Sequence, residues 1–129
     1  MAAAEQAVSS YQKVVDELWT MPKKSLNDID DVAMDPASLQ KQLLQTQRGN
    51  GMTASGEMTY RDVTSRSVPG EDHATVHVDV CADADKFVVK DAKGKRTGEG
   101  ARTSRMTYTV QQWGDKWYVS KETAEPAKC

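Results

Sequence analysis

Apolar residues recur every three to four positions along the first part of the chain, the spacing of one face of an α-helix. Residues 4–20 follow this spacing most closely. The apolar positions are Ala4, Ala7, Val8, Tyr11, Val14, Val15, Leu18 and Trp19, and the opposite face holds Gln6, Ser9, Lys13 and Asp16. Pro22 cannot continue a helix, so the pattern predicts one amphipathic helix that ends just before it.

Two further helical segments are predicted before residue 50. Ser25 can cap a short helix. A stronger signal for the start of a helix follows, with Asp35 as the N-cap and Pro36 at the first helical position. We expect this helix to run to about Arg48, because the glycines of segment 49–51 stop it. Inward-facing side chains are expected at Leu26, Ile29 and Val32 in the first segment and at Leu39, Leu43 and Leu44 in the second.

After residue 52 the pattern changes to a period of two, which predicts β-strands. Segment 73–82 is the clearest strand. One face holds Ala74, Val76, Val78 and Val80, and the other holds His73, Thr75, His77, Asp79 and Cys81. Strands are also predicted at 57–68 and 87–92, followed by a loop at 93–101. In the first of these, Val63 breaks the alternation, so we expect a β-bulge at Arg61-Asp62.

The segment 103–123 predicts a β-hairpin with a two-residue turn at Gly114-Asp115. This turn sets Trp113 opposite Lys116 and Val110 opposite Val119. Met106, Tyr108, Val110, Trp117 and Val119 then share one hydrophobic face, and Trp113 lies on the other. We therefore expect Trp117 in the core and Trp113 outside it.

Helices followed by strands indicate an α+β fold, with N-terminal helices packed on a curved antiparallel sheet. We expect one domain over residues 1–129, with helices at about 4–49 and the sheet at about 56–124. The apolar stripe of the first helix should cover the hydrophobic face of the hairpin. The candidate core or pocket residues are Tyr11, Trp19, Tyr108 and Trp117.

Charge and cysteine content narrow the functional classes. The net charge of −2 argues against a general nucleic-acid binder. The sequence contains no run of about 18 apolar residues, so it predicts no membrane-spanning helix. Cys81 and Cys129 allow two readings, a disulfide or two unrelated thiols, and the even count favours the disulfide.

Several local motifs occur in a recognisable order. They are the run from Tyr11 to Trp19, the strand end at 78–83, the hairpin at 88–95, the Trp-x-Val of 117–119 and the final Cys129. This order resembles the nuclear-transport-factor-two-like (SnoaL-like, cystatin-like) superfold, and within it small secreted proteins and lipoproteins of actinobacteria. The resemblance implies a cone of sheet and helices, a Cys81–Cys129 disulfide and an extracytoplasmic location. Any membrane attachment would come from a lipid anchor outside this chain.

His77 and Asp79 are the candidate general bases, because some relatives of this fold use Asp or His in the cone for isomerisation, dehydration or hydrolysis. Both alternate with the valines of strand 73–82, and only one face of that strand can pack under the helices. Burying valines is favourable, whereas burying an unpaired Asp is not. We therefore expect both side chains to point outward and neither to be catalytic. Two histidines and no dense carboxylate cluster predict no metal site, and the absence of a cofactor-binding motif predicts no cofactor.

Three functional classes remain open. The first is a non-enzymatic extracytoplasmic binding module of the cell envelope, as the soluble part of a lipoprotein, which binds a protein partner or a small apolar ligand. The second is a SnoaL-like small-molecule enzyme. The third is an accessory envelope protein of a phage or mobile element. A cavity lined by a buried Asp or His would favour the enzyme, and a filled cone would favour the other two. Monomer and homodimer are equally compatible with the sequence.

Overall fold

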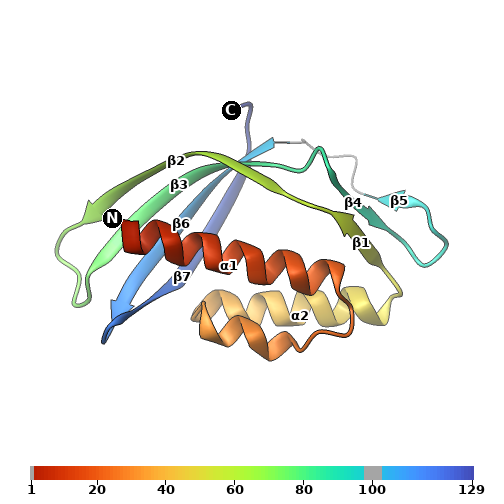
Figure 1. Ribbon diagram of the computed structural model, residues 1–129, viewed down its shortest axis with the longest axis horizontal. Coiled ribbons are helices and arrows are strands. Elements are labelled where there is room, and N and C mark those ends of the chain that lie inside the picture. The colour runs from red at the N-terminus through yellow and green to blue at the C-terminus, as the bar shows by residue number, and fades with distance from the viewer. Residues whose placement is uncertain (1, 98–102) are drawn as a thin grey trace.

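The computed structural model describes residues 2–97 and 103–129, apart from the side chains of 35–38. Its α+β architecture is as predicted: two helices lie under an arched antiparallel sheet (Figure 1). The main sheet has the order β2-β3-β6-β7, and a smaller sheet has the order β1-β4-β5. The elements are α1 (Ala2–Thr20), a 3₁₀ helix η1 (Leu26–Asp31), α2 (Asp35–Gly49), β1 (Thr53–Gly56), β2 (Thr59–Val68), β3 (Thr75–Asp83), β4 (Phe87–Lys90), β5 (Arg96–Thr97), β6 (Thr103–Trp113) and β7 (Lys116–Pro126).

Helix α1 buries the stripe that its periodicity predicts. Ala4, Val8, Tyr11 and Leu18 are all at most 3% exposed. Trp19 is partly buried against the same core. In the short helix η1, Ser25 caps the first turn by accepting from the backbone N–H of Asn27, and Ile29 is fully buried. In α1 and η1 the buried apolar side chains are therefore among those that the sequence predicts to face inward.

Helix α2 differs from the prediction in which side chains it buries. Leu44 is 1% exposed, but Leu39 and Leu43 are 68% and 42% exposed, so the expectation that both face inward is wrong. The inward row of α2 instead consists of Gln40, Leu44 and Arg48, which are spaced four residues apart. The Arg48 guanidinium explains this choice, because it donates to the backbone carbonyls of Leu18, Met21 and Lys24 where the chain leaves α1. Packing that row inward turns Leu39 and Leu43 to the surface.

The start of α2 is tied to the edge of the main sheet. The N–H of Met34 donates to the carbonyl of Val119 at 2.9 Å, and the N–H of Val119 donates to the carbonyl of Val32 at 3.0 Å. The helix begins at Asp35, with Met34 rather than Asp35 in the capping position. This tether holds α2 against β7.

The valine face of β3 forms the centre of the core, as predicted. Val76, Val78 and Val80 are at most 5% exposed. The expected bulge in β2 is present between Arg61 and Thr64, and Asp62 has a positive φ of 56° there. Because the one extra residue of β2 is absorbed locally, β2 and β3 stay paired on both sides of the bulge.

The β6–β7 hairpin has the predicted register at its turn, with Trp113 opposite Lys116 and Val110 opposite Val119. Beyond this point a second bulge, which the alternation does not predict, changes the pairing. Thr109 pairs with Lys121, so Ser120 is an extra residue and Glu122 pairs with Tyr108. The inner face of β7 after the bulge therefore carries Glu122 instead of Lys121.

The smaller sheet differs from the prediction, because it contains two strands that the sequence pattern did not indicate. The strand β1 and the two-residue β5 were not predicted; β5 lies in the expected loop 93–101, of which 98–101 is outside the described residues. Gly56 has a φ of +87°, and a Cβ atom there would lie 1.8 Å from the carbonyl oxygen of Lys86. Only glycine allows this close approach of the two backbones.

The two cysteines are joined. A disulfide links Cys81, near the end of β3, to Cys129, with their Cα atoms 6.0 Å apart. The pairing implied by the family resemblance is therefore present. Disulfides are typical of proteins in oxidising compartments. Within residues 2–97 and 103–129, no helix combines the length and apolar character needed to cross a membrane.

Candidate functional site

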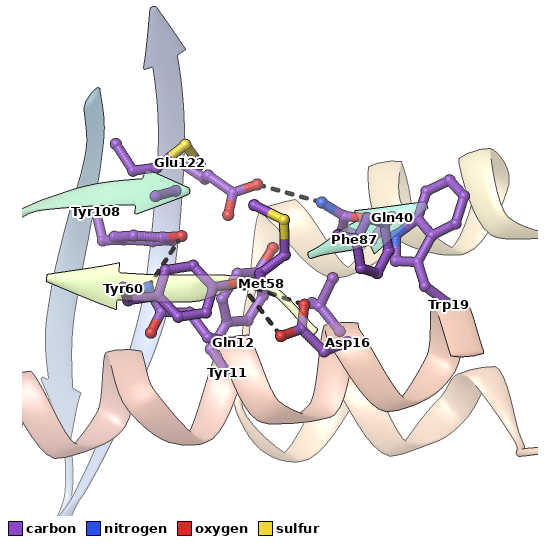
Figure 2. A pocket seen from close by; sticks show the side chains of 13 residues that line it. Tyr11, Gln12, Asp16, Trp19, Gln40, Met58, Tyr60, Phe87, Tyr108 and Glu122 are labelled. Carbon is purple, nitrogen blue, oxygen red and sulfur yellow. Dashed lines mark hydrogen bonds between the residues drawn. The ribbon is translucent and has the colours of Figure 1, made fainter. Parts of the chain in front are cut away.

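A cavity of about 230 Å³ lies between the helices and the two sheets (Figure 2). It is partly open to solvent, and its wall is mainly apolar. Helix α1 contributes Tyr11, Gln12, Val15, Asp16 and Trp19, and α2 contributes Gln40. The sheets and their junctions contribute Met58, Tyr60, Ala82, Phe87, Met106, Tyr108 and Glu122.

Two carboxyl groups, Asp16 and Glu122, lie on different walls of this cavity. Asp16 follows Gln12 by one helical turn on α1, and Glu122 reaches the cavity because of the bulge at Ser120. Neither forms one of the ion pairs found in the described part of the chain. No Lys, Arg or His is among the described lining residues. The described wall of the cavity therefore has acidic groups and no basic counterpart.

The Asp16 carboxyl is an unusually weak acid for an aspartate. Burial raises its pKa from the ordinary 3.8 to about 6, since the charged form loses hydration. The nearby Glu57 carboxylate raises the pKa further. The Tyr60 hydroxyl opposes both effects by donating to Asp16 Oδ1 at 3.2 Å. Asp16 is thus poised to change charge slightly below neutral pH.

Glu122 is held in place by an amide from α2. Gln40 Nε2 donates to Glu122 Oε1 at 3.2 Å, which links the tethered helix to β7 across the cavity (Figure 2). Burial raises the pKa of the Glu122 carboxyl, and interactions with Gln40, Tyr108 and Tyr11 partly offset this rise. Gln40 Oε1 is buried and accepts no hydrogen bond from the described residues.

The Tyr11 hydroxyl is another buried polar group with no hydrogen-bond partner among the described residues. Its side chain is 1% exposed, and its hydroxyl makes no hydrogen bond with acceptable geometry to any described residue, although it lies near Gln40 and Glu122. Its ring meets Tyr108 edge to face, with centroids 5.9 Å apart. Burial raises the pKa of Tyr11, Tyr60 and Tyr108, so all three phenols stay protonated at neutral pH.

The arrangement suits a small ligand with an apolar body and a polar head. Aromatic and methionine side chains supply the apolar wall, and the oxygens of Asp16, Glu122, Gln40 and Tyr11 supply the polar groups. Among the described residues, no group of three or more His, Cys, Asp or Glu is close enough together to hold a metal ion.

Three of the four residues predicted as core or pocket line this cavity. They are Tyr11, Trp19 and Tyr108. Trp117 lies elsewhere, partly buried against the hydrophobic core. Trp113 is 43% exposed and stacks on His73, with ring centroids 3.7 Å apart.

His77 and Asp79 are not part of the cavity. His77 Nδ1 lies 3.2 Å from a guanidinium nitrogen of Arg66, its cross-strand neighbour on β2. Asp79 accepts from the Thr107 hydroxyl at 2.6 Å, its cross-strand neighbour on β6. Both pairs lie on the face of β3 opposite the valines, where the sequence predicts them.

The acidic residues of the site were missed by the sequence reasoning. Asp16 was assigned to the polar face of the first helix, but the structure turns it into the cavity with Gln12, which is 8% exposed. The signal that could have found it is the one-turn spacing of Gln12 and Asp16 beside Tyr11 and Trp19. Glu122 had no comparable signal, because its orientation depends on the bulge.

No protein-family model and no curated protein matches the chain. Among solved structures, the fold is similar to the crystal structure of the intermembrane space region of the chloroplast protein ARC6. The TM-score is 0.70 at 14% sequence identity, and the match covers 96% of this chain and 95% of the other. At this identity the likeness shows a shared fold alone.

Proposed function

We propose that this protein is a non-enzymatic, extracytoplasmic binding module that holds a small, largely apolar molecule in the cavity between α1, α2 and the sheets. The observation that carries the proposal is the buried Tyr11 hydroxyl, which lines this cavity and makes no hydrogen bond of acceptable geometry to any described residue. A buried polar group left without a hydrogen bond costs about 1–3 kcal/mol. A bound molecule that hydrogen-bonds to it would recover part of that free energy.

The size of the cavity limits the ligand. Engineered apolar cavities of roughly 150 Å³ bind benzene, whereas pockets for drug-sized molecules are roughly 300–1,000 Å³. At about 230 Å³, this cavity fits a molecule with one ring and a short side chain. Its walls are mostly preformed by secondary structure, so binding requires little rearrangement.

An extracytoplasmic location is supported by the Cys81–Cys129 disulfide, since oxidising compartments stabilise such bonds. The ARC6 region of similar fold is named for an intermembrane space. The nuclear-transport-factor-two-like cone, the actinobacterial lipoprotein relationship and an envelope role remain part of the same proposal. They rest on the sequence resemblance.

Methionine methyl groups provide a direct test of binding. Met58 and Met106 line the cavity, and Met21 is 51% exposed outside it. We expect small phenyl-bearing compounds to shift the ¹³C-methyl NMR signals of Met58 and Met106 while leaving that of Met21 unchanged. Equal shifts at all three methyls, or no shift at millimolar concentrations, would contradict the proposal.

A cavity-filling variant sharpens the test. Ala82 is 2% exposed and lines the cavity, whereas Ala74 is exposed just before the same strand. Ala82→Leu should abolish the shifts by occupying the space, and Ala74→Leu should preserve them. Overpacking costs about 1–3 kcal/mol, so the dispersion of the NMR spectrum must confirm that Ala82→Leu is folded.

A second candidate is acid–base catalysis of the SnoaL-like type, favoured by Asp16, whose pKa of about 6 suits a general base. Two features argue against catalysis. The Tyr60 hydroxyl already donates a hydrogen bond to the Asp16 carboxylate, and the cavity opens to water. The two functions differ in a metabolite-extract incubation followed by mass spectrometry. An enzyme consumes a compound that Asp16→Asn leaves untouched, whereas a binding module consumes none.

A further inference from the structure

We propose that the natural ligand is an organic cation, a protonated amine carried on an apolar or aromatic body. This inference rests on the proposed binding function and specifies the chemical class that the same cavity selects. Three separate features of the wall support it: its hydrogen-bonding balance, its charge and its aromatic content.

The acceptor oxygens of the wall favour a donor-rich ligand. Asp16 and Glu122 offer carboxyl oxygens, and the buried Gln40 Oε1 is an acceptor that no described residue uses. The orientation of the Gln40 amide is set by its Nε2, which donates to Glu122 at 3.2 Å. The Tyr11 hydroxyl can also accept through its oxygen. A primary ammonium brings three donors and no acceptor, which complements this set.

The charge of the wall favours a cation over a neutral donor. At pH 7.5 the Asp16 carboxyl is ionised, since its pKa is about 6, and the described wall contains no basic side chain to balance it. Burial raises the pKa of both carboxyl groups, and no basic side chain of the described wall offsets this rise. A bound cation would supply a counter-charge, and an anion would be repelled.

The aromatic content favours the same ligand. The sequence has eight Phe, Trp and Tyr residues in total, and five of them line this cavity. They are Tyr11, Trp19, Tyr60, Phe87 and Tyr108. Figure 2 shows Trp19 and Phe87 at the end of the cavity away from Tyr11, Tyr60 and Tyr108. Aromatic faces attract organic cations and pack against apolar bodies, so both parts of the ligand find contacts.

Three probes of matched shape test the proposal at pH 7.5: 2-phenylethylammonium, 2-phenylethanol and 3-phenylpropanoate. Affinities are measured from the Met58 and Met106 methyl shifts of the full chain. We expect the ammonium to bind at least about ten-fold more tightly than the alcohol, because its hydrogen bonds to carboxylates are charge-assisted. The propanoate should bind most weakly of the three.

Isosteric variants show whether the cavity carboxyls cause the preference. Asp16→Asn and Glu122→Gln should each reduce the ammonium's advantage over the alcohol several-fold while leaving the alcohol's affinity nearly unchanged. Glu57→Gln is the matched control, since Glu57 is an exposed carboxylate near Asp16 that does not line the cavity. It should retain the preference.

The outcomes separate this inference from the binding function. If the alcohol or the propanoate binds as tightly as the ammonium, the inference is wrong and the binding function stands. A preference for the ammonium that survives in both carboxyl variants also overturns it, because recognition would then lie outside the cavity. If none of the probes shifts Met58 or Met106, both the inference and the binding function fail.

Discussion

Glu122 lies directly opposite Tyr108 across β6 and β7, because Ser120 is an extra residue in β7. Without this bulge, the pairing of Val110 with Val119 would continue to Tyr108 with Lys121. The bulge therefore exchanges a lysine for a glutamate on the inner face of the sheet. The acidic character of the cavity depends on this exchange.

We predict that Glu122→Gln increases the free energy of unfolding at pH 7.5. Burial raises the pKa of Glu122, so the folded state disfavours its charged form, and an uncharged amide removes that penalty. The Gln side chain can still accept from Gln40. Urea unfolding of the variant and of Glu71→Gln, an exposed control, measures the effect. A loss of stability in Glu122→Gln alone would mean that the carboxylate is favourable where it lies.

Asp16 should give the protein a stability that depends on pH. Its folded-state pKa of about 6 lies above the ordinary 3.8, so the folded state binds more protons between these values. Stability from this group therefore falls as pH rises from about 4 to 6 and stays constant above that. The full shift would correspond to about 3 kcal/mol, and partial exposure reduces this to about 1–2 kcal/mol.

The variant Asp16→Asn removes this titration while keeping an acceptor for Tyr60. We expect it to be more stable than the native chain at pH 7.5 and nearly equal to it at pH 4. Unfolding midpoints at several pH values check this, with the exposed Asp72→Asn as the control. The same pH profile in the native chain and in Asp16→Asn would show that another group is responsible.

Much of the fold could be predicted because its main signals are periodic. The stripe through Val8, Tyr11 and Leu18 and the alternation of Val76 and Val78 both require one buried face, and the structure buries those faces. Apolar periodicity does not report side chains that are buried for hydrogen bonding. In α2, Arg48 faces inward to bind three carbonyl groups, and this rotates Leu39 and Leu43 to the surface.

The site was harder to predict than the fold, for two physical reasons. Asp16 and Gln12 are polar residues on a cavity wall, and periodicity assigns such residues to the solvent-facing side. Glu122 faces inward only because of one extra residue, and a segment with few apolar residues such as 120–126 gives no alternation from which to detect a bulge. The aromatic part of the cavity wall could be predicted from the sequence, since Tyr11, Trp19 and Tyr108 were predicted as core or pocket.

Removing the disulfide should destabilise the protein strongly. The bond joins residues 48 positions apart, and a closed loop of this length contributes about 4 kcal/mol by restricting the unfolded chain. We expect the double variant Cys81→Ser/Cys129→Ser to lose most of this amount in urea unfolding. The native protein should lose a similar amount of stability when it is unfolded in reducing buffer. An unchanged midpoint in both experiments would show that the unfolded chain gains little freedom from the loss of the bond.

The two tryptophans beside the hairpin turn should differ in their contribution to stability. Trp117 is partly buried against the hydrophobic core, whereas Trp113 is 43% exposed and contacts His73 on the other face. Deleting a large aromatic side chain from a core costs about 3–5 kcal/mol, and partial burial reduces the expected loss for Trp117→Ala to about 2–4 kcal/mol. Trp113→Ala removes mainly one ring stack, so its expected loss is about 1 kcal/mol.

Both substitutions lie within two residues of the same turn, so they perturb the same hairpin and serve as controls for each other. Urea unfolding of the two variants gives the difference directly. A register shifted by one residue would exchange the two faces and reverse the order of the losses. It would also turn Val119, which is fully buried, toward solvent and remove Glu122 from the cavity. The order of the two losses therefore tests the pairing on which the ligand site depends.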